Sequence, residues 1–149
     1  MAHLPAYPKR SIPCYTTPMN TYTWYQELVR PGWAPPSWLF GPVWAVLYAI
    51  IAVSFGHVAY LYLQGRIPFM VFLPFLFNLA FNFAFTPLQF GLQNNILAAI
   101  DILLVLGTLG WALYAIHSYA AWVAYVNIPY VAWVAFASVL QLTITYLNW

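Results

Sequence analysis

Four long apolar segments, almost free of charge, constrain this chain more than any other feature. They run over about 38–63, 67–92, 96–116 and 128–147, and only Asp101 interrupts them with a charge. A helix needs about 20 mainly apolar residues to cross the hydrocarbon core of a bilayer. Charged residues make up 4% of the chain, whereas soluble domains carry roughly a quarter, so lipid must cover most of the surface. The sequence therefore predicts an all-α integral membrane bundle of four transmembrane helices.

The first 23 residues differ from everything that follows. Prolines at positions 5, 8, 13 and 18 are too closely spaced for a helix, and no apolar stretch of signal-peptide length is present. We therefore expect an irregular proline-rich tail over 1–23 and a membrane domain over 24–149.

Four spans with short turns place both termini on one side of the membrane. That side receives Lys9, Arg10 and Arg30, whereas the other receives only Arg66. Because cytoplasmic loops carry an excess of basic residues, we expect a multi-pass protein with both termini in the cytoplasm.

Polar side chains follow one face of the second span. Asn78, Asn82, Thr86 and Gln89 recur at helical spacing, and Phe85 borders them. An unpaired amide in hydrocarbon is costly, so these groups must face the interior of the bundle or a cavity. The pattern leaves two interpretations open: the lining of a ligand pocket, or interhelical hydrogen bonds of about 0.6 kcal/mol each.

Asp101 has two interpretations as well. A carboxylate inside a span can be a proton or ligand site. It can also be a group near a helix N-terminus that the helix dipole favours and its neighbours satisfy.

Small residues recur along one face of the first span, at Ala45, Ala49, Ala52 and Gly56. Small residues let membrane helices approach closely. This face is therefore predicted to serve helix packing.

The sequence gives no support to metal binding, acid–base catalysis or nucleic-acid binding. His57 and His117 have no partner at metal-ligand spacing, and two carboxylates in the whole chain leave little for acid–base catalysis. A net charge of +2 gives no reason to expect nucleic acid. We expect no metal site, no catalytic residues of the acid–base kind and no required cofactor.

The stretch from Trp24 to Tyr48 is unusually rich in tryptophan and proline. Trp44 and Tyr48 share a helical face, and Trp133 has a small neighbour, Ala137, one turn away. Flat aromatic walls with a few polar groups suit a flat, apolar ligand.

These motifs together resemble the translocator protein family, also known as the tryptophan-rich sensory protein, TspO/MBR or peripheral benzodiazepine receptor family. The resemblance covers Trp24 to Asn148. Its motifs are Trp24-Tyr25, Leu28, Pro31, Trp33, Pro35-Pro36, Trp38, Gly41-Pro42-Val43-Trp44, Leu47-Tyr48, Asn82, Ala84, Pro87, Phe90-Gly91, Ala98, Asp101, Leu103-Leu104-Val105, Pro129-Tyr130, Ala132-Trp133, Phe136-Ala137, Val139-Leu140 and Leu147-Asn148.

The resemblance implies a membrane receptor or sensor that binds porphyrins such as protoporphyrin IX and haem, or similar flat apolar ligands, and that transports them. It implies a homodimer. It also implies a pocket that opens towards the loop before the first span. By motif position, its lining would be Tyr25, Pro36, Trp44, Tyr48, Asn82, Phe85, Thr86, Trp133, Ala137 and Leu140.

The chain departs from the family pattern in three ways. The family has five helices, and the first of them is replaced here by the proline-rich tail. Phe85, Gln89 and Gln141 stand where the family usually has Trp, Phe and Asn, which predicts a more polar pocket. No Lys or Arg follows Tyr146, so the family's sterol-recognition pattern is incomplete and sterol binding is not expected.

Two alternative functions remain open. Some bacterial relatives are credited with light- or oxygen-dependent porphyrin breakdown, which would make the protein an enzyme. Alternatively, the four helices have a structural role and assemble with partner proteins.

Overall fold

The computed structural model describes residues 21–149, with side chains from residue 24 onward. Four long helices form its body: α2 (Phe40–Leu63), α3 (Phe69–Thr86), α4 (Asn95–His117) and α6 (Ile128–Leu147). A 3₁₀ turn, η1 (Ser37–Leu39), precedes α2, and a π-helical segment, η2 (Pro87–Gly91), extends α3. Each of the four long helices, with these short extensions, is long and apolar enough to cross a membrane. The prediction of an all-α bundle with four spanning helices is confirmed.

Local signals in the sequence explain where these helices begin and end. The Asn94 side chain accepts hydrogen bonds from the backbone N–H groups of Ile96 and Leu97, which caps α4. Gly65 adopts a positive φ of 67° in the turn after α2, a conformation that glycine reaches without a steric penalty. Pro68 lies immediately before α3 and supplies the extended backbone from which that helix starts.

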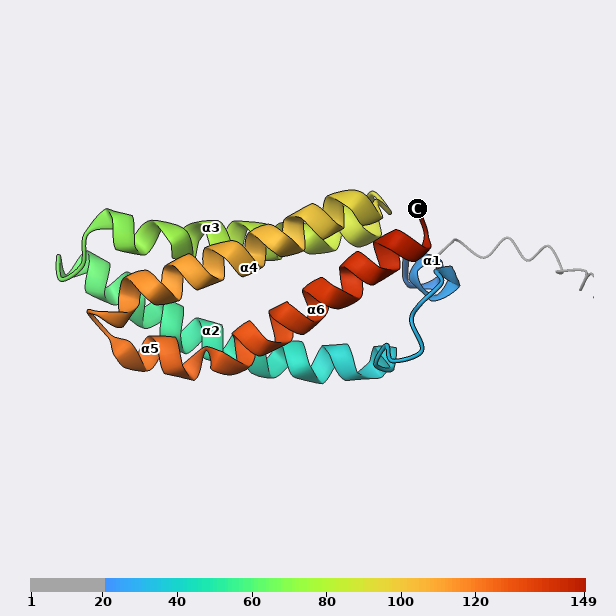
Figure 1. Ribbon diagram of the computed structural model, residues 1–149. Coiled ribbons are helices and arrows are strands. Elements are labelled where there is room, and N and C mark those ends of the chain that lie inside the picture. The colour runs from blue at the N-terminus through green and yellow to red at the C-terminus, as the bar shows by residue number, and fades with distance from the viewer. Residues whose placement is uncertain (1–20) are drawn as a thin grey trace, which may run out of the picture.

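The long helices differ in how closely they pack (Figure 1). Helices α3 and α4 lie side by side along their whole length, and α6 crosses α4 at an angle. Helix α2 lies on the other side of the bundle, and its backbone approaches the other helices less closely. The Phe55 ring of α2 packs edge-on against Phe75 of α3, with 4.8 Å between centroids. Backbone packing is therefore tightest between α3 and α4, and the α2 side is more open.

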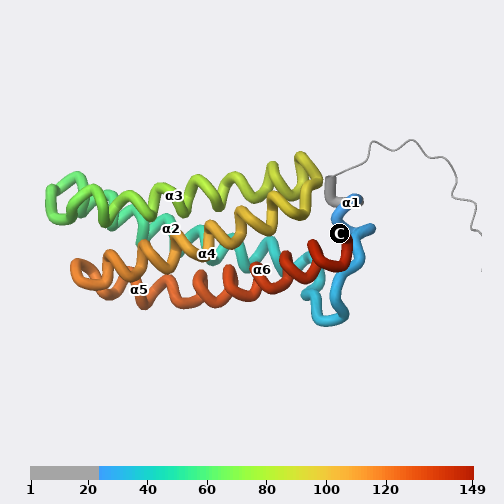
Figure 2. The backbone as a smooth tube through the Cα atoms, turned by 45° about the horizontal axis from the view of Figure 1, so that its top comes forward, coloured from blue at the N-terminus to red at the C-terminus, as the bar shows by residue number. Residues whose placement is uncertain are grey.

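Both ends of the described chain lie at one end of the bundle. Figure 2 shows the C-terminus beside the short helix α1 (Thr21–Glu27) and the loop that leads into α2. An even number of spans requires this arrangement. The side of the membrane on which this end lies stays a prediction.

Two local features differ from the expectation. The connector after α4 contains a short helix, α5 (Ala121–Val126), and the expected tail boundary at residue 23 falls inside α1. The rest of the expected tail, residues 1–20, lies outside the described residues.

The small-residue face of α2 points outward. Ala45, Ala49, Ala52 and Gly56 are all exposed, and no atom would lie within 4 Å of a Cβ added at Gly56. Within residues 21–149 this face therefore does not pack against another helix, contrary to the simplest form of the packing prediction.

Candidate functional site

A chain of hydrogen bonds runs through the middle of the bundle and joins all four long helices. The Tyr48 hydroxyl donates to Asn82 Oδ1 (2.9 Å), and Asn82 Nδ2 donates to the Tyr130 hydroxyl (2.7 Å). Tyr130 in turn donates to Asn78 Oδ1 (3.0 Å), and Asn78 Nδ2 donates to the Val105 carbonyl oxygen (2.9 Å). We call these side chains, Tyr48, Asn82, Tyr130 and Asn78, the central network.

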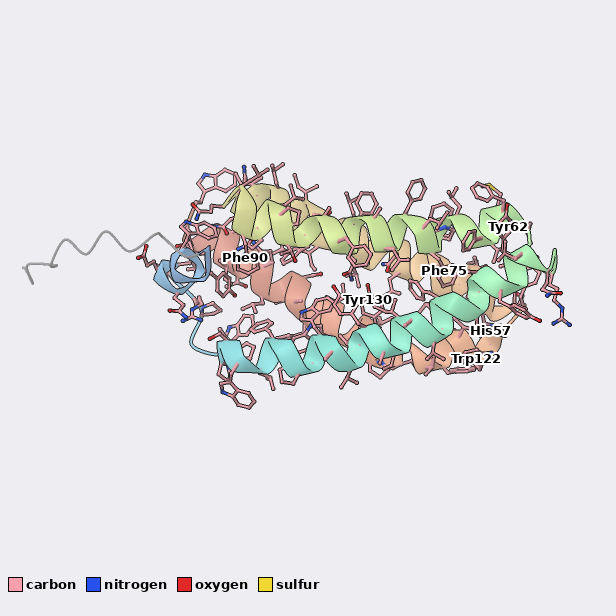
Figure 3. All side chains as sticks on the ribbon, turned by 180° about the vertical axis from the view of Figure 1, so that it is seen from behind. His57, Tyr62, Phe75, Phe90, Trp122 and Tyr130 are labelled. Atoms are coloured by element: carbon pink, nitrogen blue, oxygen red, sulfur yellow. The ribbon has the colours of Figure 1, made fainter. Side chains whose placement is uncertain are left out.

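The central network has one direction and one open end. In each hydrogen bond of the network, the donor is the group nearer to Tyr48 along the chain of bonds. Figure 3 places Tyr130 between α2 and the other helices, near the middle of the bundle. Tyr130 and Asn78 are fully buried, whereas Tyr48 keeps 39% of its surface exposed. Only Tyr48 can therefore meet a molecule that arrives from outside.

An aromatic wall surrounds this open end. The ring centroids of Trp44 and Tyr48 lie 5.5 Å apart, and those of Tyr48 and Phe83 lie 6.3 Å apart with an interplanar angle of 11°. Trp44 is half-buried and Phe83 is exposed. We call Trp44, Tyr48 and Phe83 the aromatic wall. It joins α2 to α3 and presents flat apolar surface beside a fixed hydroxyl.

A second polar cluster lies nearer the end of the bundle, and its residues Asn95 and Thr145 also line an open cavity there. Gln141 Nε2 donates to Gln89 Oε1 (3.0 Å), and Gln89 Nε2 donates to Asn95 Oδ1 (3.2 Å). The Thr145 hydroxyl donates to the Asn95 carbonyl oxygen (3.0 Å). Gln89, Gln141 and Thr145 are buried. We call Gln89, Asn95, Gln141 and Thr145 the end network, and it ties η2, α4 and α6 together.

The polar stripe predicted on the second span therefore divides. Asn78, Asn82 and Gln89 are buried and bonded to other helices, so their amides serve as interhelical hydrogen bonds. Thr86 is exposed, and Phe85 packs against the core while half-buried. Thr86 lies on the edge of the stripe turned away from this interior.

Trp133 of α6 belongs to another aromatic group, which also contains Phe40 of α2 and Phe136 of α6, and which we call the Trp133 group. Its ring lies 5.7 Å from Phe40 and 5.6 Å from Phe136, between centroids. The indole Nε1 is buried and has no hydrogen-bond partner among the described residues. Ala137 is half-buried and Leu140 is buried, so the three α6 residues proposed as pocket lining follow one inward side of that helix.

The segment from Trp24 to Pro36, which we call the lid, is attached to the bundle at several points. Asn148 clamps its backbone, because Val29 N–H donates to Asn148 Oδ1 (3.0 Å) and Asn148 Nδ2 donates to the Val29 carbonyl oxygen (2.9 Å). The Tyr25 ring packs 5.7 Å from Phe90, which Figure 3 shows beside α1. The Trp33 ring packs 5.9 Å from Phe136.

The lid also holds a cation over an aromatic ring. The Arg30 guanidinium carbon lies 5.8 Å from the centroid of the Tyr25 ring. Burial raises the pKa of the Tyr25 phenol, and the positive charge of Arg30 partly opposes that rise. Both side chains are half-buried.

Two open cavities lie at this end of the bundle. The lid cavity, of about 390 Å³, is lined by Leu28, Arg30, Pro31, Ala34, Pro35 and Pro36. The other, of about 330 Å³, lies between the α3–α4 turn and the end of α6. Neither is lined by Trp44 or Tyr48. The lining residues expected from the resemblance are thus spread over the lid, the aromatic wall, the central network, the end of α3 and the inward side of α6.

Asp101 is buried, with 4% of its surface exposed, and its Oδ2 has no hydrogen-bond partner among the described residues. The interpretation in which neighbours satisfy this carboxylate is therefore not supported at Oδ2. Within residues 21–149, no three His, Cys, Asp or Glu side chains gather as metal ligands would.

Sequence reasoning missed several residues that organise this region. Tyr130 lies near the start of a span, where a tyrosine is usually a membrane-interface residue, yet it is fully buried and bonded to two asparagines. Asn148 and Asn127 are also structural. Asn127 Nδ2 donates to the Ser54 hydroxyl (2.9 Å) and so joins the start of α6 to α2. Buried position could not be read from the sequence, because it depends on how each helix is rotated.

The fold and the buried polar networks define a multi-pass membrane protein built as a helical bundle. Comparison with known proteins is more specific. The TspO/MBR family matches residues 4–147, and the chain belongs to that family. The match begins within the proline-rich tail expected over residues 1–23.

Named relatives support the assignment. The chain is 42% identical over 83 residues to the tryptophan-rich protein TspO of Bacillus cereus, covering 56% of this chain and 53% of that protein. It is 36% identical over 89 residues to the human translocator protein, covering 56% and 50%. It is 31% identical over 100 residues to the tryptophan-rich sensory protein of Cereibacter sphaeroides, covering 65% and 61%. The matched region thus spans about half to three fifths of these relatives.

Proposed function

We propose that this protein is a membrane receptor or sensor for flat apolar tetrapyrroles, such as protoporphyrin IX or haem, and that it transports them. The aromatic wall is the observation that carries the proposal. Its rings lie on two helices within the membrane span, and the Tyr48 hydroxyl beside them is held by Asn82 at 2.9 Å. A flat apolar ring can stack on such a surface, and fixed polar groups then set its orientation. The family's sensory and translocator names agree with this role.

Titration of the purified protein with protoporphyrin IX tests the proposal. We expect saturable quenching of tryptophan fluorescence. In Trp44→Ala the affinity should fall about tenfold, because stacking on an aromatic side chain contributes about 1–3 kcal/mol. Trp111→Ala is the matched control, since Trp111 is an exposed α4 residue outside the aromatic wall. Equal affinities in the two variants would remove the aromatic wall from the site.

The same complex separates binding from porphyrin breakdown. Under illumination, a receptor leaves the porphyrin absorbance unchanged beyond the bleaching seen without protein. A new bilin-like absorbance that requires the protein would instead identify the enzymatic alternative.

We further propose that the protein is a homodimer, with the exposed small-residue face of α2 as the contact. Small residues let two membrane helices approach closely, and Ala45, Ala49, Ala52 and Gly56 are all exposed. Gly56→Leu should lower the dimer fraction measured by light scattering in detergent, whereas Val53→Leu, also at an exposed α2 position, should not. A monomeric wild-type protein would reject this part of the proposal.

We propose a cytoplasmic location for the end of the bundle that carries the lid. The sequence gives this side Lys9, Arg10 and Arg30, whereas the other side receives only Arg66, and cytoplasmic loops carry an excess of basic residues. A reporter fused after Trp149 should be active on the cytoplasmic side, and activity only on the opposite side would reverse the assignment.

A further inference from the structure

The lid cavity has a feature that an aromatic ligand site alone does not require: a positive charge, that of Arg30, with no ionic partner among the described residues. Among the described side chains, only those of Glu27, Arg30, Arg66 and Asp101 are of the Asp, Glu, Lys or Arg type. No ion pair within 4.0 Å joins any of them, so the charge of Arg30 is not neutralised by the part of the chain that the structure describes.

Arg30 is nevertheless held in place. Its guanidinium lies over the Tyr25 ring, which is packed against Phe90 of η2. The backbone one residue earlier, at Val29, is clamped by Asn148. A cation over an aromatic face is positioned but keeps its N–H donors available, because the ring accepts no strong hydrogen bond.

Prolines stiffen the walls around Arg30. Pro31, Pro35 and Pro36 line the cavity, and each proline restricts its own backbone. Ala34 N–H donates to the Pro31 carbonyl oxygen (3.0 Å) and closes the turn between them. A guanidinium in such a setting binds a carboxylate well, because its planar donors match the two oxygens and little side-chain freedom is lost.

A short stretch of chain connects the lid cavity to the aromatic wall. Pro36 lines the cavity and immediately precedes η1 and α2. Trp44 follows eight residues later, about 12 Å along a helix axis at 1.5 Å per residue. A flat ring with a short acidic side chain can bridge a separation of this order.

We propose that Arg30 binds a carboxylate of the ligand in the lid cavity, so that the site selects flat apolar rings that carry an acidic side chain. The inference rests on the proposed function, because the ring itself is assigned to the aromatic wall. An anionic lipid headgroup presents related chemistry to the same cation, and the experiment must separate the two.

Protoporphyrin IX and its dimethyl ester provide the test, because they share one macrocycle and differ in the free carboxylates. Binding is measured for the full chain in nanodiscs of phosphatidylcholine. Arg30→Gln should weaken protoporphyrin IX binding about tenfold, as expected for a charged hydrogen bond, and leave the ester unchanged. Arg30→Lys should retain part of the affinity. Arg66→Gln, at the other end of α2, should alter neither ligand.

Three results would contradict the inference in different ways. An equal loss for both ligands in Arg30→Gln would show that Arg30 only supports the lid. Arg30→Gln could instead bind both porphyrins as tightly as the wild type does and retain less phosphatidylglycerol from mixed lipids. That result would assign Arg30 to the phosphate of a lipid headgroup. Failure of the wild type to bind either porphyrin would overturn the proposed function itself, and this inference with it.

Discussion

The central network and the end network are made of similar groups but end differently. Both place amides between helices, and both satisfy them with hydrogen bonds to other helices. The end network joins η2, α4 and α6 and borders a cavity lined mainly by polar residues. The central network instead ends at Tyr48, which is 39% exposed and lies beside the rings of Trp44 and Phe83. An amide in a membrane helix therefore does not by itself mark a site. What distinguishes a site is a polar chain that reaches an accessible aromatic surface.

Among substitutions in the two networks, Tyr130→Phe is expected to lower the free energy of unfolding the most. The change leaves Asn78 Oδ1 and Asn82 Nδ2 without their Tyr130 partner in a fully buried position. An unsatisfied buried group costs about 1–3 kcal/mol, so the free energy of unfolding, measured by denaturation with SDS, should fall by about that amount. Porphyrin affinity should fall as well, because Asn82 no longer holds Tyr48 firmly. Tyr114→Phe, at an 85% exposed position, should change neither quantity.

Gln141→Leu is the corresponding change in the end network, with an expected loss of about 1–2 kcal/mol. It removes the bond to Gln89 (3.0 Å) and two weaker bonds at 3.4 Å, each worth about 0.6 kcal/mol in membrane proteins. The unfolding free energy should fall while protoporphyrin IX affinity stays at the wild-type value. A marked loss of affinity in a variant that still folds would erase the distinction between the two networks.

The smallest effect on stability is expected from Tyr48→Phe. Only one hydrogen bond is lost, at the exposed end of the central network, so stability should fall by about 0.6 kcal/mol. The ring remains and can still stack, so porphyrin affinity should fall only severalfold, as judged by fluorescence titration. If Tyr48→Phe binds as tightly as the wild type, the open end of the central network has no role in binding.

Much of the fold could be predicted from the sequence, because the relevant signals are local. The four spans follow from apolar length, and observed ends such as Leu63 and Leu147 agree with the expected ones. The candidate site could be predicted less completely from the sequence. Trp44 and Tyr48 share a helical face by periodicity alone, and their rings do lie 5.5 Å apart. Thr86 was placed with Asn82 on the same ground, yet Asn82 is buried and Thr86 is exposed. The four members of the stripe, from Asn78 to Gln89, together span a wide arc of the helix, and the neighbouring helices cover only part of that arc.

What the sequence by itself determined is the class of molecule: a charge-poor chain with four apolar spans can only fold as a membrane helical bundle, because backbone groups in lipid must be satisfied within helices. Its motifs also determined the family. Only the tertiary structure decided which polar groups meet. Tyr130 bonds to Asn78 and Asn82 from a distant helix, and Asn148 clamps a lid residue 119 positions away. Such pairs depend on the rotation and crossing of whole helices. In lipid these are set by side-chain packing and interhelical hydrogen bonds, which no local pattern encodes.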